Sequence, residues 1–303
     1  MTRRRFAARL GTAFAIVLLT AACSDSVSPS AAGTATSADG STGDPVASSA
    51  PTATTTTSSP ARVPAAVTAS RLQSIVDEFA AAHEVPFSIV AIDLSTGARA
   101  DHLSDRVVPS ASLYKLFVAS ELQRRIDGGA LSPDAPAGDG NGRTVQQCIH
   151  DMIVVSDNPC GSAGLRIVGQ GALDRSLHAN GYISTSLDSP QQTSADDVAL
   201  FLQRAHDDPA PRPLYALLQQ QQVNDRLPKG LPTGTAIAHK TGDRLRWAHD
   251  AGVISTPHGD VLLVALSGPW SLPCCDADKP GPAEAVAFGA IADLGRAVYD
   301  AVA

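Results

Sequence analysis

The stretch SLYKLFVASELQRRIDGG, residues 112–129, marks the point where the first strand-like segments of the sequence end and a helical region begins. Its apolar residues recur at helical spacing, and Gly128-Gly129 has the character of a helix C-cap. The stretch opens a long helical region that extends to about Gln222. Strand-like segments occur only before and after this region, so we expect helices in the middle of the chain and a sheet built from its two flanks.

On the amino-terminal side, Ser70 has the character of an N-cap for a helix that continues to Ala82. Residues 86–94 then predict a buried strand, followed by a turn and a weaker second strand. On the carboxyl-terminal side we expect three strands and a closing helix, at residues 236–239, 251–255, 260–267 and 283–302, with a hairpin turn at His258-Gly259. This order predicts an antiparallel sheet covered by the terminal helices, with a separate helical lobe.

The first 22 residues are typical of an export signal, because a basic start is followed by a short apolar run and two alanines. The residues Leu19-Thr20-Ala21-Ala22-Cys23 resemble the lipobox of bacterial lipoproteins. This resemblance implies cleavage before Cys23 and attachment of lipid to that residue. The protein is then expected outside the cytoplasm, anchored by lipid to the bacterial cell membrane. A plain signal peptide with an incidental cysteine is the alternative.

Residues 23–66 consist almost wholly of Ser, Thr, Ala, Pro and Gly. Such a segment buries too little apolar surface to offset the entropy cost of ordering, so we expect a disordered tether. A glycosylated stalk would have the same composition. Residues 67–303 are long enough for one large domain or two intimate lobes.

The charge of the chain limits its partners. Its 23 Lys and Arg residues are outnumbered by 30 Asp and Glu residues, the net charge is −7, and no run of positive charge occurs. Binding to nucleic acid is therefore not expected. No stretch is long and apolar enough to span a bilayer, which leaves the lipid anchor as the expected membrane contact. No feature indicates an oligomer, and we expect a monomer.

Ser112 and Lys115 form the first candidate catalytic motif, Ser-x-x-Lys. On a helix, a spacing of three places both residues on one face, and Ser112 stands at the positive end of the helix. A serine becomes nucleophilic beside a base, and a desolvated lysine can serve as that base. The motif is common by chance, and an N-cap serine beside a solvated lysine gives the same pattern.

Ser156-Asp157-Asn158 form the second candidate motif, after an apolar run at residues 152–155. A serine hydroxyl can pass a proton to a leaving nitrogen, and an asparagine amide can hold a substrate carbonyl. An ordinary turn between two helices is the alternative.

Lys240-Thr241-Gly242 form the third candidate motif, at the end of an expected strand. A lysine and a hydroxyl together can bind a carboxylate, and a glycine lets the strand approach a ligand closely. A strand-end turn with a snorkelling lysine is the alternative.

The three motifs occur in the order and in the local contexts that one chemistry requires, at a helix start, in an inter-helix loop and at a strand edge. SxxK, SDN and KTG form the signature set of class A β-lactamases and penicillin-binding proteins, and the chain resembles this superfamily from Val67 to Ala303. The resemblance implies an α/β (α+β) fold. It consists of a five-stranded antiparallel sheet with flanking N- and C-terminal helices and an all-helical lobe, with the site between sheet and lobe.

The resemblance also implies catalytic roles for the motif residues. Ser112 attacks the carbonyl of a β-lactam or a D-Ala-D-Ala-like peptide and forms an acyl-enzyme. Lys115 is its base, kept neutral in part by Lys240. Ser156 passes the proton to the departing nitrogen.

Substrate binding is assigned to the remaining positions in the same way. Asn158 holds the side-chain amide of the substrate, and Lys240 and Thr241 receive its carboxylate. Gly242 precedes Asp243, whose backbone N–H forms the oxyanion hole together with that of the nucleophile. The Asp243 side chain departs from the family pattern and would discourage anionic substrates.

A second departure concerns deacylation. Class A enzymes activate the hydrolytic water with a glutamate on a loop between the SDN and KTG motifs, and this chain has no glutamate between Ser156 and Lys240. The position that this glutamate occupies in the family falls near Gln191, and a glutamine cannot remove a proton from water. Asp188 is the other candidate for the base, but its side chain is shorter than that of glutamate and it lies two or three positions away in the sequence. The loop also ends early, since residues 193–196 already resemble the start of the next helix.

The expected function is that of a class A β-lactamase-like serine hydrolase with slow turnover of β-lactams. A penicillin-binding, DD-peptidase-like cell-wall enzyme is the close alternative. A non-catalytic lipoprotein that binds peptidoglycan or a partner is the alternative from another class. The expected ligands are thus a β-lactam or a peptidoglycan stem peptide.

Four cysteines besides Cys23 make disulfides possible in an exported domain, with three connectivities. Cys148 is expected two helical turns from a loop that carries Cys160, which places this pair out of disulfide reach. Pairing of Cys274 with Cys275, or of either with Cys160, stays open. The histidines lack metal-ligand spacing and no phosphate-binding loop occurs, so neither a metal nor a cofactor is expected.

Overall fold

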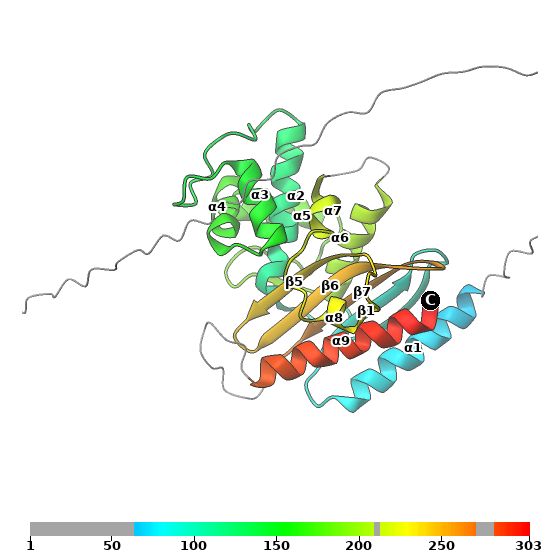
Figure 1. Ribbon diagram of the computed structural model, residues 1–303. Helices are drawn as coiled ribbons and strands as arrows, with labels where there is room; N and C mark the ends of the chain where they lie inside the picture. Colours follow the sequence, from blue (N-terminus) through cyan, green and yellow to red (C-terminus); the bar gives the residue numbers. More distant parts are fainter. Residues whose placement is uncertain (1–63, 209–212, 271–281) are drawn as a thin grey trace, which may run out of the picture. The chain divides into compact units, whose positions relative to one another are not determined.

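The computed structural model describes residues 64–208, 213–270 and 282–303, all within one compact unit that spans Ser59–Ala303. Within these residues, five strands form one antiparallel sheet in the order β2-β1-β7-β6-β5 (Figure 1). Their bounds are Phe87–Asp93 for β1, Ala98–His102 for β2, Ile237–Arg244 for β5, Trp247–Thr256 for β6 and Gly259–Ser267 for β7. The five-stranded antiparallel sheet of the predicted fold class is therefore confirmed.

The centre of the sheet is buried on both faces, as its sequence requires. All seven residues of β1 are buried, and so are Val261 to Ser267 of β7. Runs of this kind pack against a layer on each side. The two-residue turn that joins β6 to β7 consists of Pro257 and His258, one residue earlier than the predicted His258-Gly259, because Gly259 is already part of β7.

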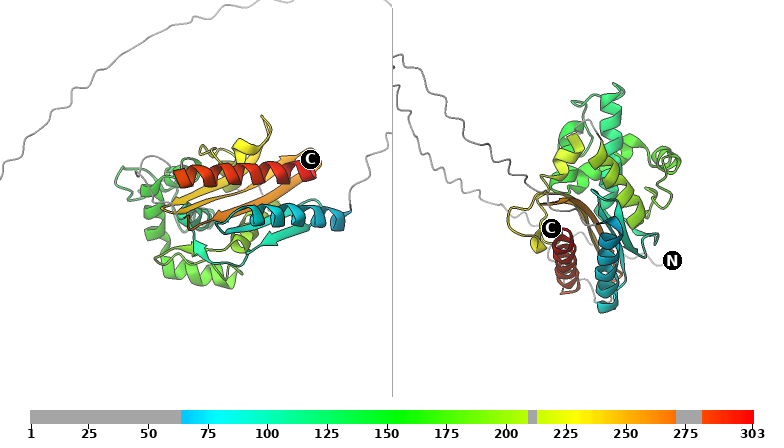
Figure 2. Two further views of the ribbon diagram at one scale, coloured as in Figure 1. Left: turned by 90° about the horizontal axis from the view of Figure 1, so that it is seen from below. Right: turned by 90° about the vertical axis from the view of Figure 1, so that its right-hand side faces the viewer.

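Two terminal helices cover one face of the sheet, namely α1 (Ala65–Ala82) and α9 (Pro282–Val302) (Figure 2). Apolar side chains from both helices and from the sheet form one of the two hydrophobic cores. The prediction of Ser70 as the N-cap of α1 was wrong. The helix begins five residues earlier, after Pro64, and the Ser70 carbonyl accepts a hydrogen bond from the Ser74 hydroxyl within the helix.

The other face of the sheet carries the helical lobe and the second core (Figures 1 and 2). The chain enters it through β3 (Val108–Pro109) and a short 3-10 turn, η1 (Ala111–Leu113). The following elements are α2 (Tyr114–Asp127), α3 (Val145–Val154), α4 (Asn158–Val168), α5 (Gln170–Ala179), β4 (Gln192–Thr193), α6 (Ala195–Asp207) and α7 (Pro213–Leu218). The chain then returns to the sheet through α8 (Leu227–Gly230), which packs on α9. The predicted helical lobe is confirmed.

A disulfide joins Cys148 to Cys160, which corrects the expectation that this pair is out of reach. The expectation placed Cys160 on a loop beyond the end of α3. Instead the chain reverses over three residues after α3 and α4 begins at Asn158, so Cys160 lies in the first turn of a helix that packs back against α3. The two Cα atoms are 4.8 Å apart. Cys274 and Cys275 lie outside the described residues.

We expect the double variant Cys148→Ala/Cys160→Ala to lower the free energy of unfolding by about 3 kcal/mol, because the bond closes a loop of roughly a dozen residues in the unfolded chain. Urea unfolding of the oxidised wild type, the reduced wild type and the variant measures this. The reduced wild type should match the variant, and equal stability of all three proteins would contradict the prediction.

No helix within the described ranges is long and apolar enough to cross a membrane. The predicted export signal and almost all of the predicted tether lie outside these ranges, so both stay predictions. The first described helix begins two residues before the predicted start of the domain at Val67.

Candidate functional site

The structure brings the two residues of the Ser-x-x-Lys motif into contact. Ser112 lies in the middle of η1 and Lys115 in the first turn of α2, and the Lys115 Nζ donates a hydrogen bond to the Ser112 Oγ over 3.1 Å. The preceding Ala111 has a positive φ of 47°, a strained conformation for a residue with a side chain. The turn therefore holds the serine hydroxyl toward the lysine at some conformational cost.

Lys115 is buried, and its Nζ is surrounded by oxygen atoms. Besides Ser112, it donates to the Ser156 carbonyl at 2.6 Å, to Asn158 Oδ1 at 2.7 Å and more weakly to Ser156 Oγ at 3.4 Å. Burial lowers the pKa of Lys115 to about 8, although the negative charges of Asp157 and Asp243 act in the opposite direction. A lysine with this pKa is partly neutral near pH 7, as a general base must be.

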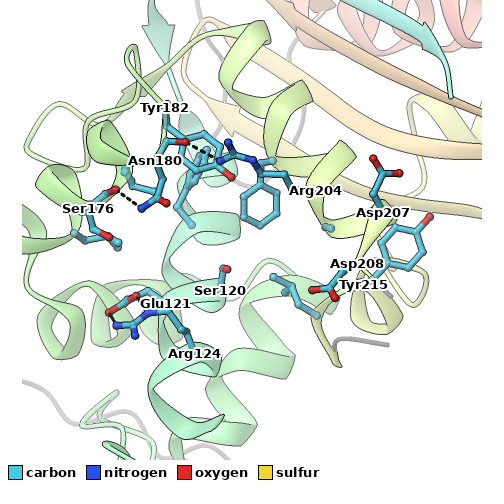
Figure 3. A pocket seen from close by; sticks show the side chains of 16 residues that line it. Ser120, Glu121, Arg124, Ser176, Asn180, Tyr182, Arg204, Asp207, Asp208 and Tyr215 are labelled. Atoms are coloured by element: carbon cyan, nitrogen blue, oxygen red, sulfur yellow. Dashed lines mark hydrogen bonds and ion pairs between the residues drawn. The ribbon is translucent and has the colours of Figure 1, made fainter. Parts of the chain in front are cut away.

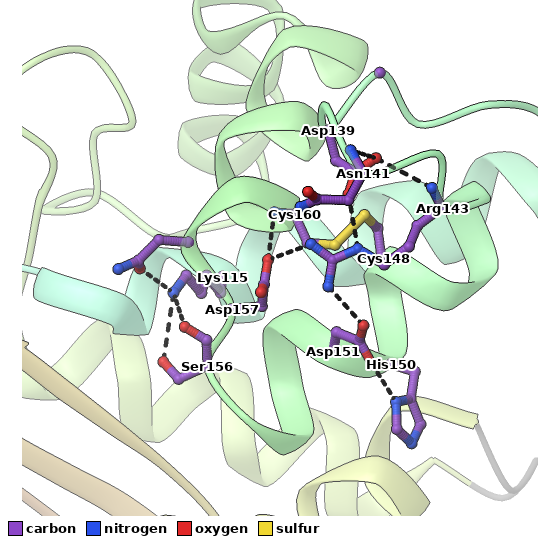
Figure 4. Close-up of polar contacts among 12 residues, drawn as sticks. Lys115, Asp139, Asn141, Arg143, Cys148, His150, Asp151, Ser156, Asp157 and Cys160 are labelled. Carbon is purple, nitrogen blue, oxygen red and sulfur yellow. Dashed lines mark hydrogen bonds and ion pairs between the residues drawn. A yellow bond between two sulfur atoms is a disulfide. The ribbon is translucent and has the colours of Figure 1, made fainter. Parts of the chain in front are cut away.

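The loop that carries Ser156 is fixed in an unusual conformation (Figure 4). Ser156 has a φ of 58°, and the following Asp157 caps α4 by accepting a hydrogen bond from the Cys160 N–H at 2.8 Å. Arg143 binds the same Asp157 carboxylate at 2.9 Å. The cap, the ion pair and the disulfide together hold the backbone that presents the Ser156 hydroxyl and carbonyl.

Arg143 was not singled out in the sequence, although it organises this part of the lobe. Its guanidinium also binds Asp139 and Asp151, each at 2.7 Å, so three carboxylates converge on one cation (Figure 4). Asp139 and Asp157 approach from different loops. No sequence pattern signals this arrangement, because the three partners share no regular spacing.

Lys240 reaches the Ser156 hydroxyl from the sheet. It lies on β5, is fully buried, and its Nζ donates to Ser156 Oγ at 2.9 Å and to the Thr241 carbonyl at 2.8 Å. Burial and the nearby charge of Lys115 hold the pKa of Lys240 well below its ordinary value. The Ser156 hydroxyl thus lies between two lysines with lowered pKa values, in a position suited to passing a proton.

Gly242 permits β5 to touch the turn that carries Ser112. A Cβ atom at Gly242 would lie 3.2 Å from Leu113 Cγ and 3.3 Å from both Ala111 Cβ and the Ser110 carbonyl oxygen. Such contacts leave no room for a side chain without a shift. The close approach expected from the glycine is therefore present, and it places Asp243 immediately beyond the contact with η1.

Arg226 is a second residue that the sequence analysis missed. Its side chain is buried, its Nη2 binds Asp243 Oδ1 at 2.6 Å, and its Nη1 donates to the His249 carbonyl at 2.8 Å. Its guanidinium lies 3.9 Å from the centre of the Phe288 ring. These partners come from β5, β6 and α9, so only the folded chain reveals the role of the arginine.

His239 was expected in a packing role. It is buried as expected, but its ring also makes polar contacts on both sides. Its ring nitrogens pair with Asp250 Oδ1 and Asn224 Oδ1, each at 3.0 Å. Asp250 also accepts from the Leu227 N–H at 3.1 Å. These contacts fasten the segment that carries Arg226 to strands β5 and β6.

His249 links the sheet to the residues before the nucleophile. Its Nδ1 accepts from the Ser267 N–H at 3.1 Å, so its Nε2 carries the proton and donates to the Pro109 carbonyl at 2.8 Å. Burial lowers the pKa of His249 to about 4. The ring is therefore neutral at pH 7 and positions the backbone three residues before Ser112.

This lowered pKa predicts a loss of stability in acid. The unfolded chain binds a proton at His249 near pH 6.5 and the folded chain only near pH 4, so stability is complete above pH 6.5 and falls as the pH drops toward 4. We expect His249 to contribute a loss of about 3 kcal/mol over this window. Urea unfolding of wild type and His249→Gln between pH 4 and 7.5 tests this, since the variant should show a flatter curve. Parallel curves would contradict it.

The loop that should carry a glutamate is short and closely tied to the site. Ser186 and Gln192 exchange two backbone hydrogen bonds, which closes the loop, and the Gln191 carbonyl accepts from the Ser110 N–H at 3.0 Å. Gln191 is half-buried, whereas Asp188 is exposed. The next helix, α6, begins at Ala195, within the stretch predicted to start it, and Ser194 caps it by accepting from the Asp197 N–H. The structure thus places Gln191, and not Asp188, beside the segment that leads into the nucleophile.

A cavity of about 510 Å³ lies elsewhere, among α2, α5, α6 and α7 (Figure 3). Phe117 and Phe201 are among the residues that line it, with Arg124 and Arg204 among its polar side chains. None of the motif residues contributes to its wall. This cavity is therefore separate from the candidate site at Ser112.

Comparison with known proteins agrees with this architecture. The fold matches that of a beta lactamase from Xanthomonas campestris pv. campestris with a TM-score of 0.66 and 21% identity, covering 78% of this chain and 99% of that chain. It matches the structure of PBP-A with a TM-score of 0.66 and 20% identity, covering 80% and 98%. A beta-lactamase from Streptomyces cellulosae is 28% identical over 279 residues, which are 78% of this chain and 86% of the relative. The sequence profile of the beta-lactamase enzyme family matches residues 68–302, and the chain belongs to this family, as its three motifs predicted.

Proposed function

We propose that the protein is a serine hydrolase that forms an acyl-enzyme through Ser112 with β-lactams or D-Ala-D-Ala-like peptides and releases the acyl group slowly. The observation that carries this proposal is the contact of 3.1 Å between the Ser112 hydroxyl and the buried Lys115 ammonium nitrogen. The lowered pKa of Lys115, to about 8, makes this nitrogen a suitable base.

The geometry supports a defined sequence of proton transfers. Neutral Lys115 removes the proton of Ser112 as Oγ bonds to the substrate carbonyl carbon. The oxyanion is placed between the backbone N–H groups of Ser112 and Asp243. As the carbon–nitrogen bond breaks, Ser156 donates its proton to the leaving nitrogen, and a neighbouring lysine restores that proton. Water then hydrolyses the ester and regenerates the serine.

Substrate binding falls to the residues around this path. Asn158 is exposed, and its side chain reaches Lys115 through Oδ1, which leaves the amide NH₂ for a substrate carbonyl. Lys240 and Thr241 face the leaving group. A point variant of PBP-A has been solved as an acyl-enzyme complex with penicillin G, and this related fold supports penicillin as a probe for the present chain.

We also place the protein outside the cytoplasm, held at the bacterial membrane by lipid on Cys23. The disulfide between Cys148 and Cys160 supports an oxidising compartment. The basic and apolar start of the chain supports export.

Intact-mass measurement over time, after addition of benzylpenicillin to the purified protein and to its Ser112→Ala variant, tests the proposal. A persistent adduct of one drug molecule on the wild type alone is expected. Rapid loss of the drug with only a transient adduct would instead indicate efficient β-lactamase turnover. No adduct and intact drug would overturn the proposal and favour a non-catalytic protein that binds peptidoglycan.

A further inference from the structure

Asp243 determines the charge next to the segment Lys240-Thr241-Gly242. Its side chain is 46% exposed, and one of its oxygens lies 2.6 Å from Nη2 of Arg226. The neighbouring Gly242 is in contact with the turn that carries Ser112. A carboxylate that belongs to the protein therefore stands beside the residues that would face the leaving group of a substrate.

Arg226 is paired within the protein through both of its Nη atoms, whereas its buried Nε makes no hydrogen bond among the described residues. Its side chain is only 1% exposed, its Nη1 donates to the His249 carbonyl and its plane lies over the Phe288 ring. A buried guanidinium binds a carboxylate strongly, and Asp243 already occupies it. A substrate anion would have to displace Asp243 to reach this cation.

Asp243 also acts on both lysines of the site. Its negative charge raises the pKa of Lys115 and of Lys240, against the lowering that burial causes. A substrate carboxylate brought to Lys240 would meet the like charge of Asp243, whose field acts on Lys240 itself. A substrate cation at the same place would meet Arg226 and the two lysines. Asp243 thus makes the site less favourable to a substrate carboxylate than Arg226 and the two lysines alone would make it.

We propose that Asp243 is a specificity-determining residue that selects acyl donors whose leaving group ends in an uncharged carboxamide over donors whose leaving group ends in a carboxylate. This inference rests on the proposed formation of an acyl-enzyme by Ser112. An amidated peptide is then a better acyl donor than a peptide with a free carboxyl terminus.

Two thioesters with the same acyl group test the proposal. N-benzoylglycyl thioglycolate carries a carboxylate on its leaving group, and N-benzoylglycyl thioglycolamide carries a carboxamide in its place. Both form the same acyl-enzyme on Ser112, so the ratio of their kcat/KM values, followed by thiol release, reports acylation alone. We expect the wild type to prefer the amide by roughly tenfold, which corresponds to about 1.4 kcal/mol of repulsion.

Asp243→Asn removes the charge but keeps an oxygen that accepts the hydrogen bond from Arg226. We expect this variant to lose the preference for the amide. The kcat/KM of the amide donor divided by that of the carboxylate donor should fall about tenfold. Asp225→Asn is the matched control, because Asp225 lies 3.3 Å from Nε of the same guanidinium and is comparably exposed. Its ratio should stay within about twofold of wild type, since its carboxylate does not follow Gly242.

The outcomes separate the two proposals. Thiol release with the same ratio in wild type and Asp243→Asn overturns the inference and leaves the acyl-enzyme function intact. An equal shift in Asp243→Asn and Asp225→Asn also overturns it, because the effect would then be a general one of charge around Arg226. Absence of thiol release and of any mass adduct on Ser112 with both donors overturns the proposed function itself.

Discussion

The Lys115→Met variant is expected to acylate Ser112 with benzylpenicillin about 10³-fold more slowly than the wild type. General base catalysis by a positioned side chain contributes roughly 10²- to 10⁴-fold, and in this site no other group is within hydrogen-bond reach of the Ser112 hydroxyl in the part of the chain that the structure describes. Methionine retains much of the buried alkyl chain, so the substitution removes chiefly the nitrogen. Stopped-flow or quenched mass measurement of adduct formation gives the rate.

The pH dependence of acylation supplies a second readout for the same residue. A base must be deprotonated to act, and the pKa of Lys115 is about 8. The acylation rate of the wild type should therefore rise about tenfold per pH unit below pH 8 and level off above it. The residual rate of Lys115→Met should lack this rise.

Lys229→Met is the matched control, because Lys229 is an exposed lysine on α8 and lies outside the motif contacts. It should retain both the rate and the pH profile of the wild type. Circular dichroism and the Tm of Lys115→Met show whether the variant is folded, since the ammonium also binds the Ser156 carbonyl. A folded Lys115→Met protein that acylates at the wild-type rate would refute the role of the lysine.

The order of secondary structure could be predicted because apolar patterns and turn residues report local structure directly. The run at 260–267 is apolar along most of its length, and it became β7, a largely buried strand in the middle of the sheet. The helical stretch ended at Gly128, as its two glycines indicated. Gly242 was expected at a close approach, and the turn around Ser112 is what approaches it. Each of these predictions depends on residues close together in the sequence.

The contacts that could not be predicted from the sequence are those between residues that are distant in the chain. Arg226 binds residues 17 and 23 positions away in the sequence and packs on Phe288, in a helix at the far end of the chain. The disulfide was misjudged for a related reason, because its geometry depends on how tightly the chain reverses between α3 and α4. That reversal is set by the Asp157 cap and by Arg143. Asp157 with Pro159 in the first turn of α4 is a typical helix start, whereas the contacts of Arg143 have no sequence signature.

The motifs themselves are positioned by such long-range contacts. Ser156 receives hydrogen bonds from two lysines that are 125 positions apart in the sequence, one on α2 and one on β5. Its own loop is held by an arginine and a disulfide that belong to the helical lobe. Residue types at the right spacing can indicate the chemistry, but the burial that lowers both lysine pKa values exists only when sheet and lobe are packed together.

The Gln191→Glu variant is expected to hydrolyse its penicillin adduct about 10²-fold faster than the wild type. The wild-type loop offers no carboxylate at this position, and a glutamine cannot remove a proton from water. The backbone of Gln191 is hydrogen-bonded to Ser110, two residues before the nucleophile, so a carboxylate introduced there starts from a segment already in contact with the site. General base catalysis of this kind contributes on the order of 10²- to 10⁴-fold, and the lower end is expected for a group without evolved positioning.

Gln192→Glu provides the control, because it adds the same charge one residue further along, where the side chain is exposed. The lifetime of the adduct, measured by intact mass after removal of excess drug, should shorten in Gln191→Glu and remain at the wild-type value in Gln192→Glu. Acylation rates should be similar in all three proteins, because Lys115 is unchanged. An unaltered lifetime in Gln191→Glu would mean that slow release has another cause than the missing carboxylate, such as exclusion of water from the ester by the short loop.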